Sequence, residues 1–316
     1  MSNNSVTRKT PLAGWLWEVS KETPFGSVFC PFSGSAAVSR LFKEEGKEVV
    51  TTDVLLTHAE AARATIENDE TILDAFDEEA IIAPFEGAPQ RLEGMAAAYA
   101  LPHEFGAWLD ACYSNIEHID HAYKKALAAT VISLVINYVL SFDDFERSKM
   151  TDHDWIAAYH YYLVSVNNNV FSNGKTCLAH DRDANSLIKE IETEAMSFYL
   201  PSMRGVIDLR PAERFSELFN RHCFERELDN TLAGLVNGLG GRFSDTAEYL
   251  AALESFLDSA SSISKWLIAA NEDSAPKPEA LNSLISKFKK NVRLLSKKII
   301  YSNKFTRTEY LYVAVD

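Results

Sequence analysis

The stretch from residue 28 to residue 53 constrains the fold of this chain more than any other. It reads VFCPFSGSAAVSRLFKEEGKEVVTTD. The apolar run Val28–Cys30 predicts a strand, apolar residues at helical spacing within Ala36–Glu45 predict a helix, and Gly46 is a plausible helix stop. A second strand begins at Val49 and Val50. Strand, turn, helix and strand in this order make a βαβ unit of a parallel sheet.

The turn inside this unit is a candidate ligand site. Its residues Phe32, Ser33, Gly34 and Ser35 are mostly small, and Asp53 stands at the end of the second strand. Such a unit can hold an adenosine-type ligand, because the turn backbone approaches the ligand and the acid accepts hydrogen bonds from ribose hydroxyls. One glycine is a weak signal, so an ordinary strand–helix turn stays open as the alternative.

Composition predicts a folded, helix-rich protein with a sizeable core. The 316 residues are 47% hydrophobic and include 18 Phe, 12 Tyr and 5 Trp against 13 Gly and 10 Pro. Four cysteines lie far apart without a CxxC pair, which fits a reducing cytoplasm and offers no zinc signature. The N-terminal residues MSNNSVTRKT contain no apolar signal core, so we expect a cytoplasmic protein.

One uncharged run, residues 126–142, has two interpretations: a buried helix or a membrane span. The run is short for a span and contains Thr130, Ser133, Asn137 and Ser141. We therefore expect a central buried helix.

The charge is unevenly distributed. The formal net charge of −14 argues against broad electrostatic attraction to nucleic acid. Residues 57–120 hold 14 acids against two arginines, a net −12, whereas residues 277–316 hold nine Lys and Arg against three acids, a net +6. An acidic half and a basic end suggest separate partners or surfaces. The acidic run at 77–79 is a solvated face, a surface that repels DNA or a surface that binds a basic partner.

The order of predicted elements describes an α/β core with an antiparallel edge. Residues 57–172 are almost wholly helical, and strand signals return at 175–180, 196–200 and 266–270. Two final strands, 292–301 and 309–315, can pair as a hairpin. We expect a core of residues 1–56 and 174–316 with an acidic helical insertion at 57–173.

This order, with the turn, resembles the D-twelve (Dam-like) class of adenine-specific DNA methyltransferases. In that family an F-x-G-x-G turn binds S-adenosylmethionine; here the turn is FSGSA, with Ala36 at the second glycine. The resemblance assigns cofactor contacts to Phe32, Ser33, Gly34 and Ser35. It assigns further cofactor contacts to the acids Asp53 and Asp183. It implies a Rossmann-like S-adenosylmethionine-dependent methyltransferase core, with DNA as the expected ligand.

The family's catalytic Asp-Pro-Pro-Tyr motif is absent from this sequence. The matching positions after the predicted strand 196–200 are Leu200, Pro201, Ser202 and Met203. The family's Asp and a neighbouring carbonyl accept the hydrogens of the adenine amino group, and its Tyr stacks on the base once the base has left the duplex. Losing one aligned polar stabiliser costs about 10²- to 10³-fold in rate. The N-terminal Pro-x-x-Gly-Lys motif of the family also departs here, with Trp15 in place of Lys.

Six basic residues are candidate DNA contacts. Arg204, Arg210 and Arg214 follow the altered motif, on the side where the family meets the target strand. Lys289, Lys290 and Arg293 belong to a basic cluster at 287–298 that could meet phosphates or could be solvated surface. His118 and His121 have i, i+3 spacing but lack further ligands, so we expect no metal.

Two functions remain open from the sequence. One is an adenine-specific DNA methyltransferase family protein of the restriction–modification type, with doubtful activity because of its altered motif. The other is a catalytically inactive subunit, a pseudoenzyme, that binds DNA or a partner protein in a restriction or anti-phage complex. In the second case the acidic insertion would be the partner surface.

Overall fold

The computed structural model describes residues 11–274, 276–302 and 305–316, which divide into two compact units. Of these described residues, the core unit holds those from Pro11 to Val54 and those within Asn173–Ile207 and Ala233–Asp316. The helical unit holds Leu55–Ser172 and Asp208–Leu232. Residues 208–232 therefore pack with the helical unit, although the sequence analysis assigned them to the core.

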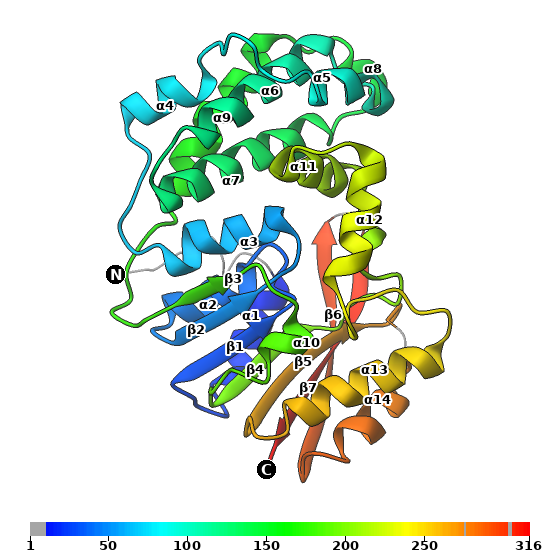
Figure 1. The fold of residues 1–316 in the computed structure, drawn as a ribbon. Coiled ribbons are helices and arrows are strands. Elements are labelled where there is room, and N and C mark those ends of the chain that lie inside the picture. Colours follow the sequence, from blue (N-terminus) through cyan, green and yellow to red (C-terminus); the bar gives the residue numbers. More distant parts are fainter. Residues whose placement is uncertain (1–10, 275, 303–304) are drawn as a thin grey trace. The chain divides into compact units, whose positions relative to one another are not determined.

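The core unit is built on one seven-stranded sheet (Figure 1). Its strands are β1 Ser27–Pro31, β2 Glu48–Thr52, β3 Leu178–His180, β4 Ala195–Tyr199, β5 Lys265–Asn271, β6 Asn291–Ser302 and β7 Phe305–Val315. They lie in the order β3-β2-β1-β4-β5-β7-β6. The first five strands are parallel, and β7 runs antiparallel to both β5 and β6. This mixed sheet with its terminal hairpin confirms the expected α/β fold class.

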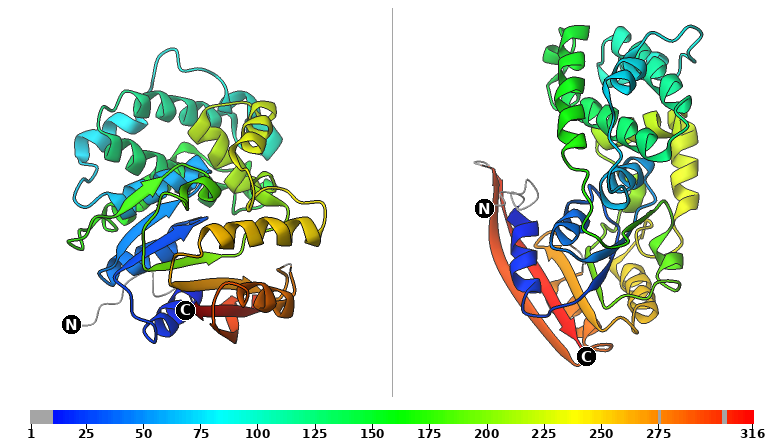
Figure 2. Two further views of the ribbon diagram at one scale, coloured as in Figure 1. Left: turned by 60° about the horizontal axis from the view of Figure 1, so that its bottom comes forward. Right: turned by 90° about the vertical axis from the view of Figure 1, so that its left-hand side faces the viewer.

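Helices cover both faces of the sheet (Figures 1 and 2). The helices of the core unit are α1 Pro11–Ser20, α2 Ala37–Glu44, α10 Ala184–Leu187, α13 Thr246–Ser259 and α14 Pro278–Ile285. Alternate strand residues such as Phe198 and Trp266 pack with α10, α13 and α14 in one buried cluster. Helices α1 and α2 contact each other and lie toward the other face.

The helical unit consists of α-helices with two short irregular helical segments. Its elements are α3 Leu56–Ala62, η2 Arg63–Glu67, α4 Ala75–Ile82, α5 Leu92–Met95, η3 Ala96–Tyr99, α6 His103–Glu117, α7 Ala122–Val139, α8 Asp144–Arg147, α9 Asp152–Asn167, α11 Pro211–Arg221 and α12, which starts at Glu225 and ends at Leu235. Helix α7 is buried along most of its length, which confirms the expected central helix. Within the described ranges no helix is both long and apolar enough to span a membrane.

A buried carboxylate explains why α11 belongs to the helical unit. The Glu217 side chain has no exposed surface and accepts hydrogen bonds from the Leu56 and Thr57 amides at 2.9 and 3.0 Å. At the start of α3 these two amides have no acceptor within the helix itself, and Glu217 supplies one. A carboxylate at this end of a helix also complements the helix dipole. The Arg221 guanidinium donates to the same carboxylate at 2.7 Å. This contact spans 160 residues, so local sequence patterns give no hint of it.

Candidate functional site

The sheet brings the turn after β1 and the acid after β2 together. Because β1 and β2 are parallel neighbours, their carboxyl ends meet at one edge. The Gly34 amide donates to Asp53 Oδ2 at 2.9 Å, and the Ser33 amide donates to the Thr52 carbonyl at 3.1 Å. The turn and the acid therefore lie next to each other, with the Asp53 carboxylate bound to the turn backbone.

The turn takes a left-handed path at three residues. The φ angles of Phe32, Gly34 and Ala36 are 54°, 53° and 55°. A Cβ added at Gly34 would meet nothing within 4 Å, so the backbone there faces open space. Ala36 takes a conformation that glycine adopts without strain.

A hydroxyl in this turn lacks a partner. Ser33 Oγ is buried and makes no hydrogen bond to any described residue. Buried polar atoms in folded proteins are almost always paired, so this oxygen is an exception that lies beside the open backbone of Gly34. Ser35 is exposed, whereas the Phe32 ring packs against Phe198 and Phe256.

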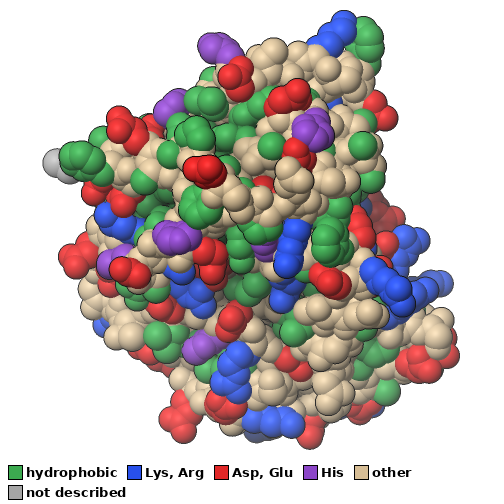
Figure 3. Space-filling model, turned by 45° about the horizontal axis from the view of Figure 1, so that its top comes forward, with side chains coloured by type: hydrophobic (Ala, Val, Ile, Leu, Met, Phe, Trp, Pro, Cys, Tyr) green, Lys and Arg blue, Asp and Glu red, His purple; other side chains and the backbone are tan. Residues whose placement is uncertain are grey.

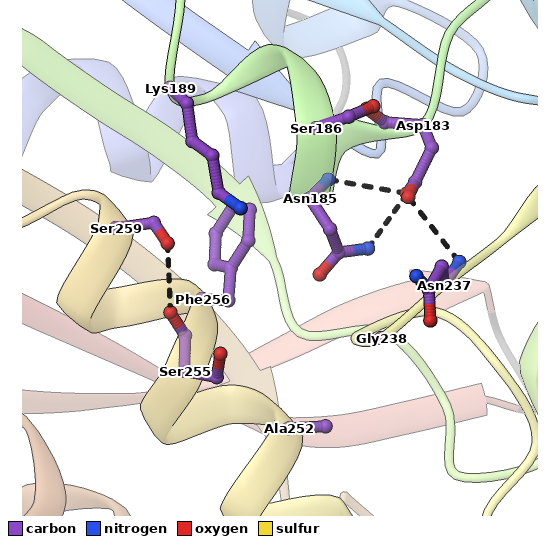
Figure 4. Close-up of a pocket in the computed structure, with 10 residues that line it drawn as sticks. All are labelled: Asp183, Asn185, Ser186, Lys189, Asn237, Gly238, Ala252, Ser255, Phe256 and Ser259. Carbon is purple, nitrogen blue, oxygen red and sulfur yellow. Dashed lines mark hydrogen bonds between the residues drawn. The ribbon is translucent and has the colours of Figure 1, made fainter.

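Asp183 organises a second loop at the same edge, as Figure 4 shows. It caps α10 and accepts from the Asn185 side chain at 2.7 Å and from the Asn237 amide at 3.3 Å. The Asn185 side chain in turn exchanges two hydrogen bonds with the Leu239 backbone, each 2.9 Å long. These residues border a cavity of about 520 Å³ that extends along α13 to Ser259.

The loop held in this way, residues 237–241 (NGLGG), is part of the site although the sequence analysis did not assign it there. A Cβ at Gly205 would lie 2.5 Å from the Gly241 backbone, and a Cβ at Gly240 would lie 3.2 Å from the Phe32 ring. The Val206 amide also donates to the Gly240 carbonyl at 3.1 Å. The three glycines were the available signal, because close backbone approach requires them.

The segment 200–203 follows β4 and lies between core and surface. Leu200 is buried in the hydrophobic core, and its amide donates to the Ala269 carbonyl at 2.8 Å. The Pro201 carbonyl accepts from the Tyr249 hydroxyl at 2.8 Å, and burial raises the pKa of Tyr249 well above its usual value. Ser202 Oγ accepts from the Arg204 amide at 3.0 Å, and Met203 packs partly on the core. No carboxylate occupies this tetrapeptide.

A second cavity, of about 470 Å³, opens beside this segment. It is lined by Tyr199, Leu200, Pro201, Ser202, Met203, Arg204, Asn271, Asp273 and Ser274. Asn271 is the last residue of β5, so the cavity lies at the same carboxyl edge as the turn. The buried Glu309 carboxylate accepts from the Tyr199 and Tyr301 hydroxyls at 3.0 and 2.6 Å. Burial, followed by the nearby Glu309 charge, raises the pKa of Tyr199.

Strand register separates the predicted basic contacts from this cavity. Asn291 is opposite Val315, which is opposite the first residue of β5, whereas Lys297 is opposite Glu309, which is opposite Asn271. The cluster 289–293 therefore lies at the amino end of the sheet, about 20 Å along β6 from the position of Lys297. Lys297 and the neighbouring Lys298 lie at the cavity end and are exposed.

The individual basic residues have different surroundings. The Lys289 ammonium is buried, donates to Asp316 at 2.7 Å and lies over the Trp266 ring, so its assignment as a DNA contact is corrected. Arg293 pairs with Glu22 at 2.5 Å, and Lys290 is exposed.

The three arginines divide between the units. Arg204 lines the 470 Å³ cavity of the core unit. Arg210 pairs with Glu213 in the helical unit, and Arg214 pairs there with Glu225 and Asp229. The acids within the helical unit thus already engage both of these guanidinium groups. Within the described part of the chain, His, Cys, Asp and Glu form no group of three with metal-binding geometry.

Comparisons with known proteins place this geometry in context. Over 338 residues, covering 98% of this chain and 96% of the relative, the sequence is 23% identical to the type II methyltransferase M2.HphI of Haemophilus parahaemolyticus. The chain is a distant homologue of a type II methyltransferase. A scan of protein-family models finds no match.

Two solved structures are similar to the chain over its whole length. One is TrmN from Thermus thermophilus, with 9% identity and a TM-score of 0.35; the chain spans 55% of that protein. The other is magnesium protoporphyrin IX methyltransferase (ChlM) from Synechocystis PCC 6803 with bound SAM, with 8% identity, a TM-score of 0.34 and 86% of that protein covered.

Proposed function

We propose that this protein is a DNA methyltransferase-like protein that binds S-adenosylmethionine and DNA, takes adenine as its target base and has at most slow methyl transfer. The distant homology to a type II methyltransferase supports the class. The proposed slow rate of methyl transfer rests on the burial of Leu200 in the core, because the position that should receive the adenine amino group then has no hydrogen-bond acceptor.

The turn after β1 fits the methyl donor. The orphan Ser33 hydroxyl, the open space at Gly34 and the adjacent Asp53 carboxylate are the groups that would hold its nucleoside part. Asp183, which caps α10 beside the 520 Å³ cavity, is the further acid at this edge. The bound donor supplies an electrophilic methyl group on sulfonium sulfur; the chain's own residues bind and orient it.

The 470 Å³ cavity is where a base extruded from DNA would lie. Its volume falls within the usual range of small-molecule sites, and it opens between segment 200–203 and the end of β5. Arg204 on its border and Lys297 and Lys298 at the same end of the sheet are the cations we assign to phosphates. Removing two phosphate contacts should reduce the slope of the logarithm of the binding constant against the logarithm of the salt concentration by about two.

DNA binding tests this assignment with a matched control. Fluorescence anisotropy with labelled duplex DNA would be measured over a range of salt concentrations. The double variant Lys297→Glu/Lys298→Glu should bind about tenfold or more weakly, with a shallower salt slope. Lys290 directly precedes β6, at the end of the sheet opposite to Lys297 and Lys298. Lys290→Glu should therefore bind like the wild type. Equal loss in both variants would contradict the assigned surface.

Methyl transfer tests the proposed rate. Tritiated S-adenosylmethionine and a mixed-sequence genomic duplex should give incorporation about 10²-fold or more below that of an intact adenine methyltransferase assayed alongside. Incorporation at the rate of the intact enzyme would contradict the role we give to Leu200.

A non-catalytic subunit is the second candidate, and the surface of the helical unit favours it. Phe76 is 85% exposed, Tyr161 71% and Val164 58%. The upper part of Figure 3 shows hydrophobic side chains at the surface with acidic ones among them. An acidic surface with large apolar side chains is suited to a basic protein partner in a restriction or anti-phage complex. Charge reversal at Glu78 and Glu79 would abolish capture of such a partner and leave S-adenosylmethionine binding unchanged.

A further inference from the structure

The side chain of Asn271 lines the 470 Å³ cavity and is held in one orientation. Its Nδ2 donates to the Tyr199 hydroxyl oxygen at 2.5 Å, and its Oδ1 accepts from the Asp273 amide at 2.8 Å. A backbone amide can only donate, so the Asp273 contact fixes which end of the side chain is oxygen. The backbone is also fixed, because the Asn271 amide donates to Ser274 Oγ at 3.0 Å.

Each end of this side chain keeps one unused hydrogen-bonding position. A primary amide has two N–H donors and two lone pairs on oxygen. The contacts to Tyr199 and Asp273 use one of each, and no described residue takes the second donor or the second lone pair. A donor and an acceptor side by side match the edge of adenine, where the amino group adjoins a ring nitrogen.

A buried charge strengthens the amide oxygen as an acceptor. The Tyr199 hydroxyl, which accepts from Asn271, donates to Glu309 Oε2 at 3.0 Å, and Glu309 is 1% exposed. Hydrogen bonds in such a chain polarise one another in a low-dielectric interior. Electron density is thereby shifted from Glu309 through Tyr199 to the Asn271 amide and its oxygen.

We propose that Asn271 is the base-recognition residue of this cavity: its Oδ1 accepts from the amino group of an extruded adenine, and its Nδ2 donates to the adjacent ring nitrogen. This role rests on the proposed function and gives the amino group an acceptor that segment 200–203 lacks. Tyr199 is the positioning residue that holds the amide, and Glu309 acts through Tyr199.

Oligonucleotide binding tests this role without knowledge of a recognition sequence. Labelled single strands of about 12 thymidines carry one central deoxyadenosine or one deoxyinosine, which replaces the amino group by an oxygen. The single strand removes the cost of base extrusion. Anisotropy titration of the full-length protein should give about tenfold tighter binding to the deoxyadenosine strand.

Variants assign this preference to the side chain. Asn271→Ala should bind both strands equally, and Tyr199→Phe, which keeps the ring, should reduce the preference to about threefold. Asn282→Ala, the same substitution in α14, should keep the full preference. A thermal melt of each variant checks folding, and Tyr199→Phe keeps the test informative if Asn271→Ala unfolds.

The outcomes separate this inference from the proposed function. Measurable binding without any preference in the wild type, or a preference that survives in Asn271→Ala, overturns the role of Asn271 and leaves the proposed function standing. Absence of binding to either strand contradicts the proposed function and this inference together.

Discussion

The loops after β1 and β4 lie at the same edge of one sheet, yet they differ in whether their groups already have partners within the protein. After β1, the backbone at Gly34 faces open space and the Ser33 hydroxyl is buried without a partner. After β4, the Leu200 side chain is in the core and the Pro201 carbonyl already accepts from Tyr249. The first loop has a hydroxyl without a protein partner, whereas Leu200 and the Pro201 carbonyl of the second loop are already packed or hydrogen-bonded within the protein.

The comparison indicates which of the two loops has a group left over for a ligand. A polar loop with an unsatisfied group costs stability unless a ligand completes it, whereas a loop packed on the core stabilises the fold. We therefore expect substitutions at Leu200 and around the Pro201 carbonyl to act mainly on stability, and substitutions after β1 to act mainly on binding. The four tests below, in order of decreasing effect, can break or sharpen this contrast.

Placing an acid at position 200 should give the largest effect. Leu200→Asp would bury a carboxylate at a site that is 4% exposed, and should lower the free energy of unfolding by about 4 kcal/mol without increasing methyl transfer. Urea unfolding measures this loss, with Leu200→Met as the volume-matched control. A stable Leu200→Asp protein with raised activity would show that a carboxylate at position 200 can reach the cavity from the core, and would contradict the argument from burial.

The two loop glycines provide the next contrast. Gly205→Ala would place a Cβ 2.5 Å from the Gly241 backbone at a φ of +67°, which should cost about 3 kcal/mol. Gly34→Ala has a similar φ of +53° but no atom within 4 Å, and should cost about 1 kcal/mol. Thermal unfolding of both proteins gives the comparison, and equal losses would show that the loop after β4 can relax.

The third test removes the Tyr249 hydroxyl, which donates to the Pro201 carbonyl. Tyr249→Phe removes the bond to the Pro201 carbonyl and should cost about 1 kcal/mol, because the side chain is fully buried. The midpoint of urea unfolding checks this value. An unchanged midpoint would mean that the bond contributes nothing to holding segment 200–203.

The smallest expected effect is a gain. Ala36→Gly relieves a left-handed residue at φ 55° and should raise stability by up to about 1 kcal/mol, since the backbone there needs no Cβ. Differential scanning calorimetry can resolve a shift of this size. A loss of stability would show that the buried methyl group contributes more than the strain costs.

Local patterns were sufficient to predict much of the fold. The βαβ unit, the central helix α7 and the terminal hairpin follow from hydrophobic spacing over 10 to 25 residues. The assignment of 208–232 to the core failed because Glu217 contacts the start of α3, which is 160 residues away in sequence. No periodicity signals a contact of that kind.

The candidate site was predictable only where it is local. The turn and Asp53 belong to one βαβ unit, so their proximity follows from the parallel pairing of β1 and β2. The basic cluster could not be placed without strand register, which moves Lys289 to the far end of the sheet and brings Lys297 to the cavity end. The hydrogen bond between Asn271 and Tyr199 could not be predicted either, because it links two strands at residues that are 72 positions apart in the sequence.

Calorimetric titration with S-adenosylmethionine is the most direct test of the central claim, that the loop after β1 is kept for a ligand. The wild type should bind one molecule with micromolar affinity. Asp53→Asn keeps an oxygen for the Gly34 amide but loses the charge, and should bind at least about tenfold more weakly. Asp258→Asn, the same change on the exposed side of α13, should bind like the wild type. Absence of heat at millimolar ligand, or equal affinity in Asp53→Asn, would contradict the account.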